Sequence, residues 1–234
     1  MEEKFPARGY KDNVLADCFE DAKRYFLDGY HQVDLAHALM LGEQGIISPD
    51  ELRAILKALR RLDFNAIKAR EYDGTFEDVF YLIQQEIGKH CDAETAGKLH
   101  TARSRNDIDV TIYRLRLREL CLKLIGSAVE LRRVFNELVA EHHETVMPAY
   151  THTQPAQPTT LAHFLLAMSE NLGRDIRRLR AAFDNMNRSP LGAGAITTSG
   201  FTIDRHRVAE LLGFSEPTVN SYGSIASVDY FTEA

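Results

Sequence analysis

The sequence predicts an all-α fold, and two observations on its pattern support this prediction. Apolar residues recur every three or four positions over long stretches, which is typical of helices that bury one face. The alternation of apolar and polar residues that marks a half-buried strand is almost absent. Hydrophobic residues make up 44% of the 234 residues, enough for a substantial core, whereas 14 glycines and 7 prolines are too few for a collagen-like or low-complexity chain.

Residues 1–106 are predicted to form an N-terminal helical domain. Its clearest helix start is the run Ser-Pro-Asp-Glu at residues 48–51. The serine can accept from a free N–H group, the proline needs no donor at the first helical position, and the glutamate completes a capping box. The helical pattern then lapses over residues 66–75 and returns over residues 76–87.

Residues 107–234 are predicted to contain long helices. Leucines recur every seven residues from Leu117 to Leu138, which predicts a helix of about 50 Å over residues 107–142 with an apolar stripe that needs partners. A second such pattern covers residues 159–187, and three prolines over residues 148–158 exclude a continuous helix between them. We therefore expect two long antiparallel helices.

The end of the sequence has the pattern of a beginning helix. A glycine-bearing loop follows the second long helix, and a short helix is expected over residues 204–212. Residues 227–234 then resemble a helix start without a terminal cap or polar tail. We expect residues 107–234 to be the first part of a central long-helix bundle domain, truncated at its C-terminal end.

Charge and composition exclude several classes of protein. The formal net charge of −6 argues against a surface that binds nucleic acid or anionic lipid throughout. No window approaches the roughly 18 apolar residues that cross a bilayer, and the N-terminus has no apolar signal-peptide segment. We expect a cytoplasmic chain without nucleic-acid or membrane partners, in which Cys18, Cys91 and Cys121 are reduced.

The first candidate site is the run from Lys98 to Asp107, which contains Lys98, His100, Arg103 and Arg105 just before the long helix. Cations beside the free N–H groups of a helix start could converge on an anionic ligand such as a carboxylate. The alternative is a solvated basic turn in which Asn106 or Asp107 caps the helix. Residue spacing alone does not separate the two interpretations.

The second candidate site is Tyr150-Thr151-His152-Thr153-Gln154, inside the proline-bounded reversal. A histidine among hydroxyl and amide groups can donate or accept a proton near neutral pH, although a lone loop histidine is more often merely solvated. No metal-ligand spacing such as HExxH is present. The glycines of residues 192–200 match no phosphate-loop pattern, so we expect a close backbone crossing or a ligand-facing turn there.

These segments resemble a known family. The run from Lys98 to Asp107 resembles the LHTGRSRND motif of argininosuccinate lyases, and residues 147–158 are similar to that family's MPGYTHLQxAQP. Residues 189–195, 204–214 and 220–221 resemble the segments that follow, in the same order. On these motifs the chain is identified as a member of the argininosuccinate lyase branch of the fumarase/aspartase superfamily.

The resemblance implies an all-α homotetramer with a central helical bundle and active sites shared between subunits. It implies a carbon–nitrogen lyase of arginine biosynthesis that takes a small anionic substrate, argininosuccinate, and cleaves it to arginine and fumarate by β-elimination. It implies no cofactor and no metal. Two alternatives remain: a related lyase that acts on another N-substituted aspartate, or an inactive, crystallin-like structural homologue.

The resemblance also assigns roles to individual residues. His152 matches the catalytic acid/base histidine, and Thr151 matches a carboxylate-binding threonine. Gln154 is a further substrate-binding candidate. Substrate-contacting positions of the first motif are matched by Ser104, Arg105 and Asn106.

The sequence departs from the family pattern in two ways. Ala102 replaces a usual glycine, Asp34 stands near the position of a substrate-binding serine, Phe80 replaces a histidine and Val228 an arginine. We expect the changes at Asp34, Phe80 and Val228 to alter recognition of the amine half of the substrate. The family's serine base and a lysine lie on a GSSxMPxKxNP loop that is not in these 234 residues, so we expect this chain alone to be inactive.

Overall fold

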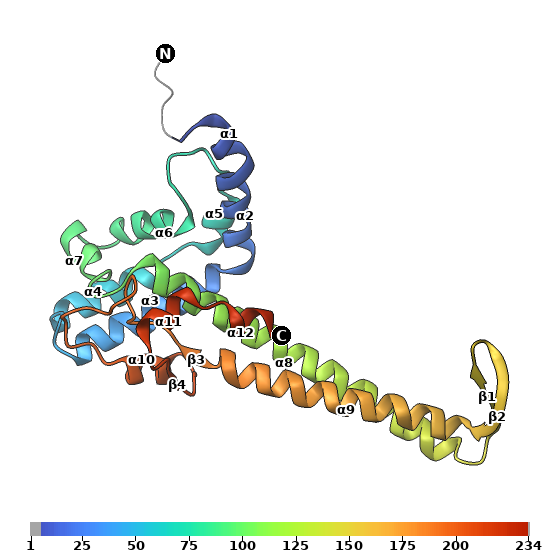
Figure 1. Cartoon of the computed structure of the whole chain (residues 1–234). Helices are drawn as coiled ribbons and strands as arrows, with labels where there is room; N and C mark the ends of the chain where they lie inside the picture. The colour runs from blue at the N-terminus through green and yellow to red at the C-terminus, as the bar shows by residue number, and fades with distance from the viewer. Residues whose placement is uncertain (1–5, 234) are drawn as a thin grey trace. The chain divides into compact units, whose positions relative to one another are not determined.

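The computed structural model describes residues 6–233 and consists mainly of helices, which confirms the all-α prediction (Figure 1). The chain divides into two compact units. Unit 1 contains the residues up to Arg116 together with Asn187–Ser227, and unit 2 contains Leu117–Met186 together with the residues from Val228 onward. The segment after the second long helix therefore packs with the N-terminal helices.

Unit 1 is built from short helices and the first turns of a long one. Two short strands, β3 (Arg188–Ser189) and β4 (Glu216–Pro217), pair in parallel within it. Its helices are α1 (Arg8–Tyr10), the π-helical η1 (Lys11–Leu15), α2 (Ala16–Tyr25), α3 (Leu27–Glu43), α4 (Pro49–Leu59), α5 (Phe64–Ala69), α6 (Val79–Gly88), α7 (Ala93–Lys98), the start of α8 (Arg105–Glu141), α10 (Arg205–Leu211) and α11 (Ser221–Ala226).

Side-chain caps fix the starts of these helices. The predicted capping box of α4 is present: Ser48 Oγ accepts from Glu51 N at 3.3 Å, and Glu51 Oε2 accepts from Ser48 N at 2.7 Å. Helix α7 was not predicted from the sequence, because six residues are too few to show a helical period. It begins where Asp92 accepts from Thr95 N at 2.9 Å.

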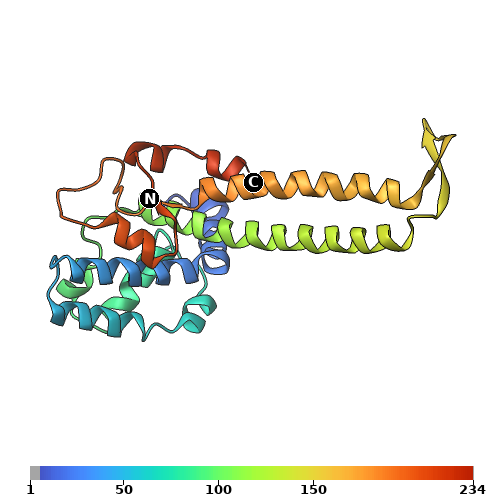
Figure 2. The ribbon, with the colours of Figure 1, turned by 90° about the horizontal axis from the view of Figure 1, so that it is seen from below.

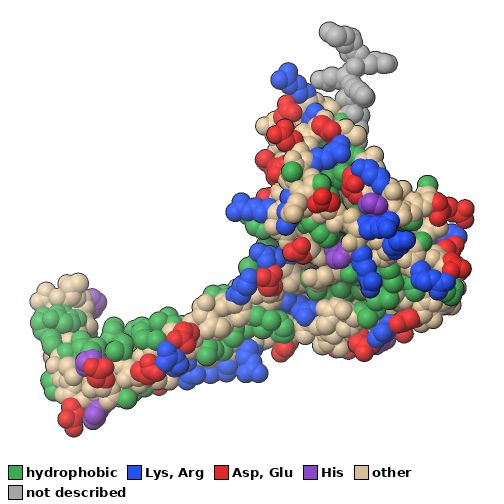
Figure 3. Space-filling model, turned by 180° about the vertical axis from the view of Figure 1, so that it is seen from behind, with side chains coloured by type: hydrophobic (Ala, Val, Ile, Leu, Met, Phe, Trp, Pro, Cys, Tyr) green, Lys and Arg blue, Asp and Glu red, His purple; other side chains and the backbone are tan. Residues whose placement is uncertain are grey.

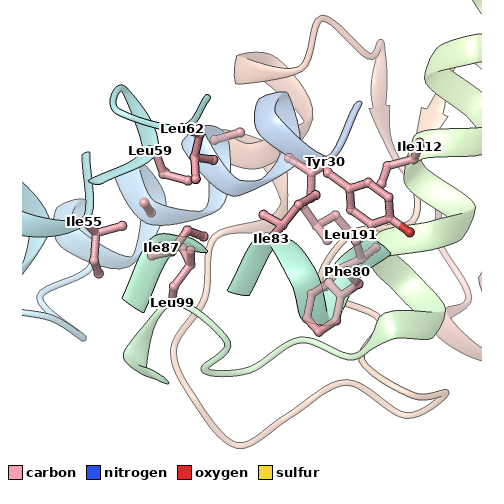
Figure 4. Packing of buried hydrophobic residues seen from close by; sticks show 14 of the residues in the cluster. Tyr30, Ile55, Leu59, Leu62, Phe80, Ile83, Ile87, Leu99, Ile112 and Leu191 are labelled. Atoms are coloured by element: carbon pink, nitrogen blue, oxygen red, sulfur yellow. The ribbon is translucent and has the colours of Figure 1, made fainter. Parts of the chain in front are cut away.

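The core of unit 1 lies between α3, α4, α6 and the first turns of α8 (Figure 4). Ile55, Ile87 and Leu99 are completely buried there. Helices α3 and α8 approach closely, because a Cβ added at Gly29 would lie 2.7 Å from Ile112 Cγ2. This packing holds the start of α8, and with it the first candidate motif, against α3.

Unit 2 is a helical hairpin formed by the rest of α8 and by α9 (Leu161–Met186), which run side by side in opposite directions (Figure 2). Ser169 Oγ donates to Asn136 Oδ1 across the pair at 2.8 Å. The short helix α12 (Asp229–Thr232) follows, and Asn185 Nδ2 donates to Glu233 Oε2 at 2.6 Å. The predicted antiparallel helices are thus confirmed, with ends within two residues of those expected.

The connection between the two long helices is a β-hairpin that was not predicted. Strand β1 (Val146–Thr151) pairs with β2 (Gln154–Thr160), and Pro148 lies opposite Pro158. Prolines disfavour central strands because they lack an N–H donor. In a two-stranded sheet each strand has an open edge, so the prolines are tolerated.

Large apolar side chains remain at the surface of unit 2 (Figure 3). On α8, Leu124 and Leu131 of the predicted stripe are 51% and 45% exposed, so α9 does not cover this face. Within unit 2, the other exposed large apolar side chains of the two helices are Leu120, Leu122, Val129, Val134, Phe164, Leu166 and Met168. Among residues 6–233, no helix combines the length and apolar character needed to cross a bilayer.

Candidate active site

The first motif lies at the start of α8, in unit 1. Ser104 Oγ accepts from Asn106 N at 3.3 Å, and Asp107 Oδ1 accepts from Ser104 N at 2.8 Å. Ser104 and Asp107 therefore cap the helix together. The alternative interpretation named Asp107 in this role, but not Ser104. Ala102, which replaces the family's glycine, has a φ of +64°, a conformation that glycine adopts without strain.

Asp107 ties the glycine loop to this helix start. Its side chain is completely buried, and Oδ2 accepts from Gly192 N and Gly194 N, both at 2.9 Å. Burial raises the pKa of Asp107, against the backbone N–H groups that lower it. A Cβ at Gly192, whose φ is +90°, would lie 2.8 Å from Arg205 Cγ. Of the two alternatives left open for this loop, the structure favours the first, a close approach of its backbone, here to the side chains of Asp107 and Arg205.

Asn106 is exposed and lies beside the same loop. Its Nδ2 donates to the carbonyl oxygen of Ala195 at 3.3 Å. The amide carries a second N–H for another acceptor, and the Ser104 hydroxyl keeps its own proton while accepting from the backbone. Ser104 and Asn106 can therefore both donate to a carboxylate placed at the start of α8.

Arg105 is surrounded by carboxylates of its own unit. Its Nη2 lies 2.5 Å from Asp78 Oδ2 and 3.6 Å from Asp109 Oδ2, and its Nη1 lies 3.4 Å from Glu77 Oε1. Tyr30 donates to Asp109 Oδ1 at 3.0 Å. Burial raises the pKa of both Asp78 and Asp109, against the guanidinium of Arg105, which lowers it.

Two of the other three cations of the motif also have carboxylate partners. Lys98 pairs with Glu51 and, at 3.3 Å, with Glu94. Arg103 Nη2 lies 2.6 Å from Asp34 Oδ1. The remaining group, His100, is exposed, and its ring lies 5.5 Å from that of Phe80. The expectation that four cations converge on one ligand is therefore wrong, because carboxylates distant in sequence pair with three of them.

Two of the four family departures lie in the core of unit 1. Asp34 is 3% exposed, and Phe80 is 5% exposed beside Tyr30 and His100. Both side chains are therefore largely enclosed by unit 1, and their effect on recognition of the amine stays a prediction. Val228, just before α12 in unit 2, is 64% exposed.

The second motif forms the tip of the β-hairpin in unit 2. Thr151 pairs with Gln154, and His152 and Thr153 between them have φ values of +46° and +64°. This two-residue turn usually requires Asn-Gly, because other residues are strained at positive φ. Thr151, His152 and Gln154 are exposed, and no side chain among residues 6–233 hydrogen-bonds the His152 imidazole. The imidazole is accessible to a ligand.

The candidate residues therefore form two groups. Ser104, Arg105 and Asn106 belong to unit 1, whereas Thr151, His152 and Gln154 belong to unit 2. Sequence reasoning missed Asp78 and Asp109 as the partners of Arg105; only Asp109, four residues after Arg105 on one helix face, had a sequence signal. Within residues 6–233, no three His, Cys, Asp or Glu side chains cluster as metal ligands would.

Comparison with known proteins identifies similar sequences over nearly the whole chain. A family model described as lyase matches residues 44–234. Argininosuccinate lyase 2 of Agrobacterium fabrum is 46% identical over 98% of this chain and 46% of its own length. Argininosuccinate lyase of Methanoculleus marisnigri is 42% identical over 91% of this chain and 43% of its own length. The chain spans about half the length of these relatives.

Solved structures are similar over most of the chain. EDDS lyase in complex with formate is 35% identical, with a TM-score of 0.83 over 90% of this chain and 41% of that protein. A variant of EDDS lyase with bound fumarate gives a TM-score of 0.82. Class II fumarase from Schistosoma mansoni, with a TM-score of 0.72 over 89% of this chain and 52% of that protein, is 15% identical and shares the fold alone.

Proposed function

The chain belongs to the lyase family of the fumarase/aspartase superfamily, and from this premise we propose that the whole protein is a carbon–nitrogen lyase that releases fumarate. Its first-choice substrate is argininosuccinate, cleaved to arginine and fumarate as a step of arginine biosynthesis. The observation that carries this proposal is the ordered pair of motifs, Lys98–Asp107 and Met147–Pro158, in a chain 46% identical to an argininosuccinate lyase.

The proposed reaction is a β-elimination. A base removes a proton from the carbon beside a carboxylate, the electron pair forms the new C=C bond, and the C–N bond breaks. Negative charge that develops on that carboxylate is stabilised by nearby donors and cations. The departing nitrogen takes a proton from an acid, and fumarate and the amine are released.

We assign His152 as the catalytic acid/base group of this reaction, because its imidazole is exposed at the tip of the hairpin. Thr151 and Gln154 flank the tip and supply hydroxyl and amide donors to the substrate. No organic cofactor or metal ion is part of the proposed chemistry.

The start of α8 is assigned to a substrate carboxylate. Ser104 and Asn106 supply side-chain donors there, beside the N–H groups and positive dipole end of the helix. Arg105 contributes as a member of its ion-pair network rather than as a free cation, since Asp78 and Asp109 already neutralise it. The contribution of Arg105 to substrate binding therefore depends on how far its guanidinium separates from Asp78 and Asp109 when the substrate binds.

We extend the proposal to a homotetramer in which residues of different subunits complete each active site. The exposed apolar side chains of α8 and α9 support this assembly, because contiguous apolar surface is typical of protein–protein interfaces. We place the protein in the cytoplasm, where its three free thiols would remain reduced.

A second candidate function is elimination from another N-substituted aspartate. The similarity to EDDS lyase, 35% identical with a TM-score of 0.83, favours this alternative. Both candidates share fumarate release and differ in the amine that leaves. A catalytically inactive, crystallin-like homologue is the third possibility.

One assay separates these three possibilities. The whole protein is incubated with argininosuccinate and with a panel of other N-substituted aspartates, and fumarate is followed by ultraviolet absorbance. We expect kcat/KM for argininosuccinate to exceed that for each other compound by about tenfold or more, a difference of about 1.4 kcal/mol. A higher value for another aspartate would support the second candidate, and no fumarate from any compound would contradict the lyase proposal.

A further inference from the structure

One face of α3 holds the segment of residues 101–109 at three points. Tyr30 donates to Asp109 at 3.0 Å, Asp34 Oδ1 lies 2.6 Å from Arg103 Nη2, and His37 Nε2 lies 2.8 Å from the carbonyl oxygen of Thr101. Tyr30, Asp34 and His37 are spaced by four and then three residues, so they share one helix face. The held segment contains Ser104, Arg105 and Asn106.

The central contact is a buried ion pair. The side chain of Arg103 is 0% exposed and that of Asp34 is 4% exposed. Removing one partner of such a pair leaves an uncompensated charge in the interior, whereas replacing both by apolar groups is often neutral or stabilising. Stability alone therefore does not account for the pair.

The surroundings make this contact the main polar anchor of Arg103. Arg103 Nε, Nη1 and Nη2, Asp34 Oδ2 and His37 Nδ1 are buried and make no hydrogen bond to the described residues, so the contact of Nη2 with Asp34 Oδ1 is an ion pair. Burial, and then the charge of Arg103, lower the pKa of His37 to about 3. His37 is thus neutral and donates through Nε2 to Thr101, so Asp34 is the negative charge that faces the guanidinium.

We infer that Asp34 is a positioning residue that acts through Arg103 to fix the proposed substrate-binding segment. Arg103 directly precedes Ser104, so a displaced guanidinium moves the backbone of the helix start that carries Ser104 and Asn106. A small displacement of binding groups is enough to weaken a substrate complex. The inference rests on the proposed function and assigns Asp34 a role that involves no contact with the substrate.

The test compares Asp34→Asn, Arg103→Met and their double variant in the whole protein with a matched control. Lys23→Met is the control, because Lys23 is also buried and charged, at 6% exposure, and donates to the carbonyl oxygen of Arg70 at 2.6 Å. Its hydrogen bonds and its ion pair within the described residues are with Lys68, Arg70 and Glu20, outside residues 101–109. Its loss destabilises unit 1 without loosening that segment.

Two quantities are measured, KM for fumarate release and hydrogen exchange of a peptide that covers residues 101–109. Both are measured at a temperature at which circular dichroism shows every variant folded. We expect Asp34→Asn to raise KM for fumarate release by about tenfold or more, equivalent to about 1.4 kcal/mol, with a smaller effect on kcat. We expect hydrogen exchange of this peptide to be about tenfold faster or more in Asp34→Asn than in the wild-type protein. The KM and the hydrogen exchange of the double variant should be no higher than those of the more impaired single variant, because both substitutions remove the same contact. Lys23→Met should lower Tm and leave KM and this exchange unchanged.

The inference is overturned if Asp34→Asn and Lys23→Met lower Tm alike and both retain wild-type KM and exchange. A wild-type protein that releases no fumarate would instead contradict the proposed function. In that case the exchange measurement still decides the inference, since unchanged exchange of residues 101–109 in Asp34→Asn overturns it.

Discussion

Carboxylate side chains of unit 1 determine which groups of the first motif remain available to a ligand. Asp34 neutralises Arg103, and Asp78 lies against Arg105. Ser104 and Asn106 keep unused donors. The start of α8 therefore offers hydroxyl, amide and backbone donors to an anion, with a cation whose charge is largely compensated.

Arg105→Ala tests how much this compensated cation contributes to binding. We expect KM for fumarate release to rise by about tenfold or more, because a charge-assisted partner of a carboxylate is lost. Arg105→Lys keeps the charge without the planar geometry, so it should fall between wild type and alanine. Equal KM values for all three proteins would exclude Arg105 from substrate binding.

Asp107→Ala tests the tie between the glycine loop and α8. The change removes a buried acceptor of three backbone N–H groups, so we expect the free energy of unfolding to fall by about 3 kcal/mol. Asp92→Ala, which removes an ordinary helix cap, should cost only about 1 kcal/mol. Urea denaturation measures both, and equal losses would show that the loop contacts add nothing.

At the scale of helices and strands, periodicity and capping chemistry predicted most of the structure. The capping box of α4 and the ends of α8 and α9 follow from local spacing. The β-hairpin around His152 could not be predicted in this way, because its prolines disfavour strands and its turn lacks the usual glycine. Sequence placed His152 in a rigid reversal but could not show that it occupies the tip of a turn.

Helix α4 provides a pH-dependent contact that can be measured. A hydrogen bond from Lys98, followed by those from Ser48, lowers the pKa of Glu51 from 4.5 to about 2. A lowered folded-state pKa stabilises the protein above the unfolded value, and this stabilisation is lost as the pH falls from 4.5 towards 2. We expect Glu51→Gln to lower Tm at pH 7 and to approach wild type near pH 2.

Thermal unfolding across this pH range checks the expectation. Glu94→Gln is the matched control, because Glu94 also pairs with Lys98, at 3.3 Å, but takes no part in the capping box. Its Tm should change less than that of Glu51→Gln. A Tm difference between Glu51→Gln and wild type that stays constant with pH would show that Glu51 does not titrate as described.

At the scale of the whole molecule, contacts between residues far apart in sequence could not be predicted from local sequence patterns. Periodicity predicted an apolar stripe in need of partners on the first long helix, and α9 leaves much of it uncovered. It could not predict that residues 187–227 pack with unit 1, or that Asp34 and Phe80 are buried there. Those facts depend on which side chains meet in three dimensions.

The exposed stripe supports a prediction about assembly. In the whole protein, Leu124→Glu together with Leu131→Glu should convert the proposed tetramer to smaller species, because charges would replace apolar contacts at the proposed interface. Light scattering after size-exclusion chromatography gives the mass. Lys123→Glu, at an exposed neighbouring position, is the control and should remain tetrameric. An unchanged mass for the double variant would place the interface elsewhere.

The most direct test of the lyase proposal is fumarate release by the whole protein and by its His152→Asn variant. We expect the wild-type protein to produce fumarate from argininosuccinate or another N-substituted aspartate. The variant should lose about 10²–10⁴-fold in kcat, with little change in KM, because a general acid acts mainly in the transition state. Equal kcat values for the two proteins would contradict the role of His152, and no fumarate from wild type would contradict the account as a whole.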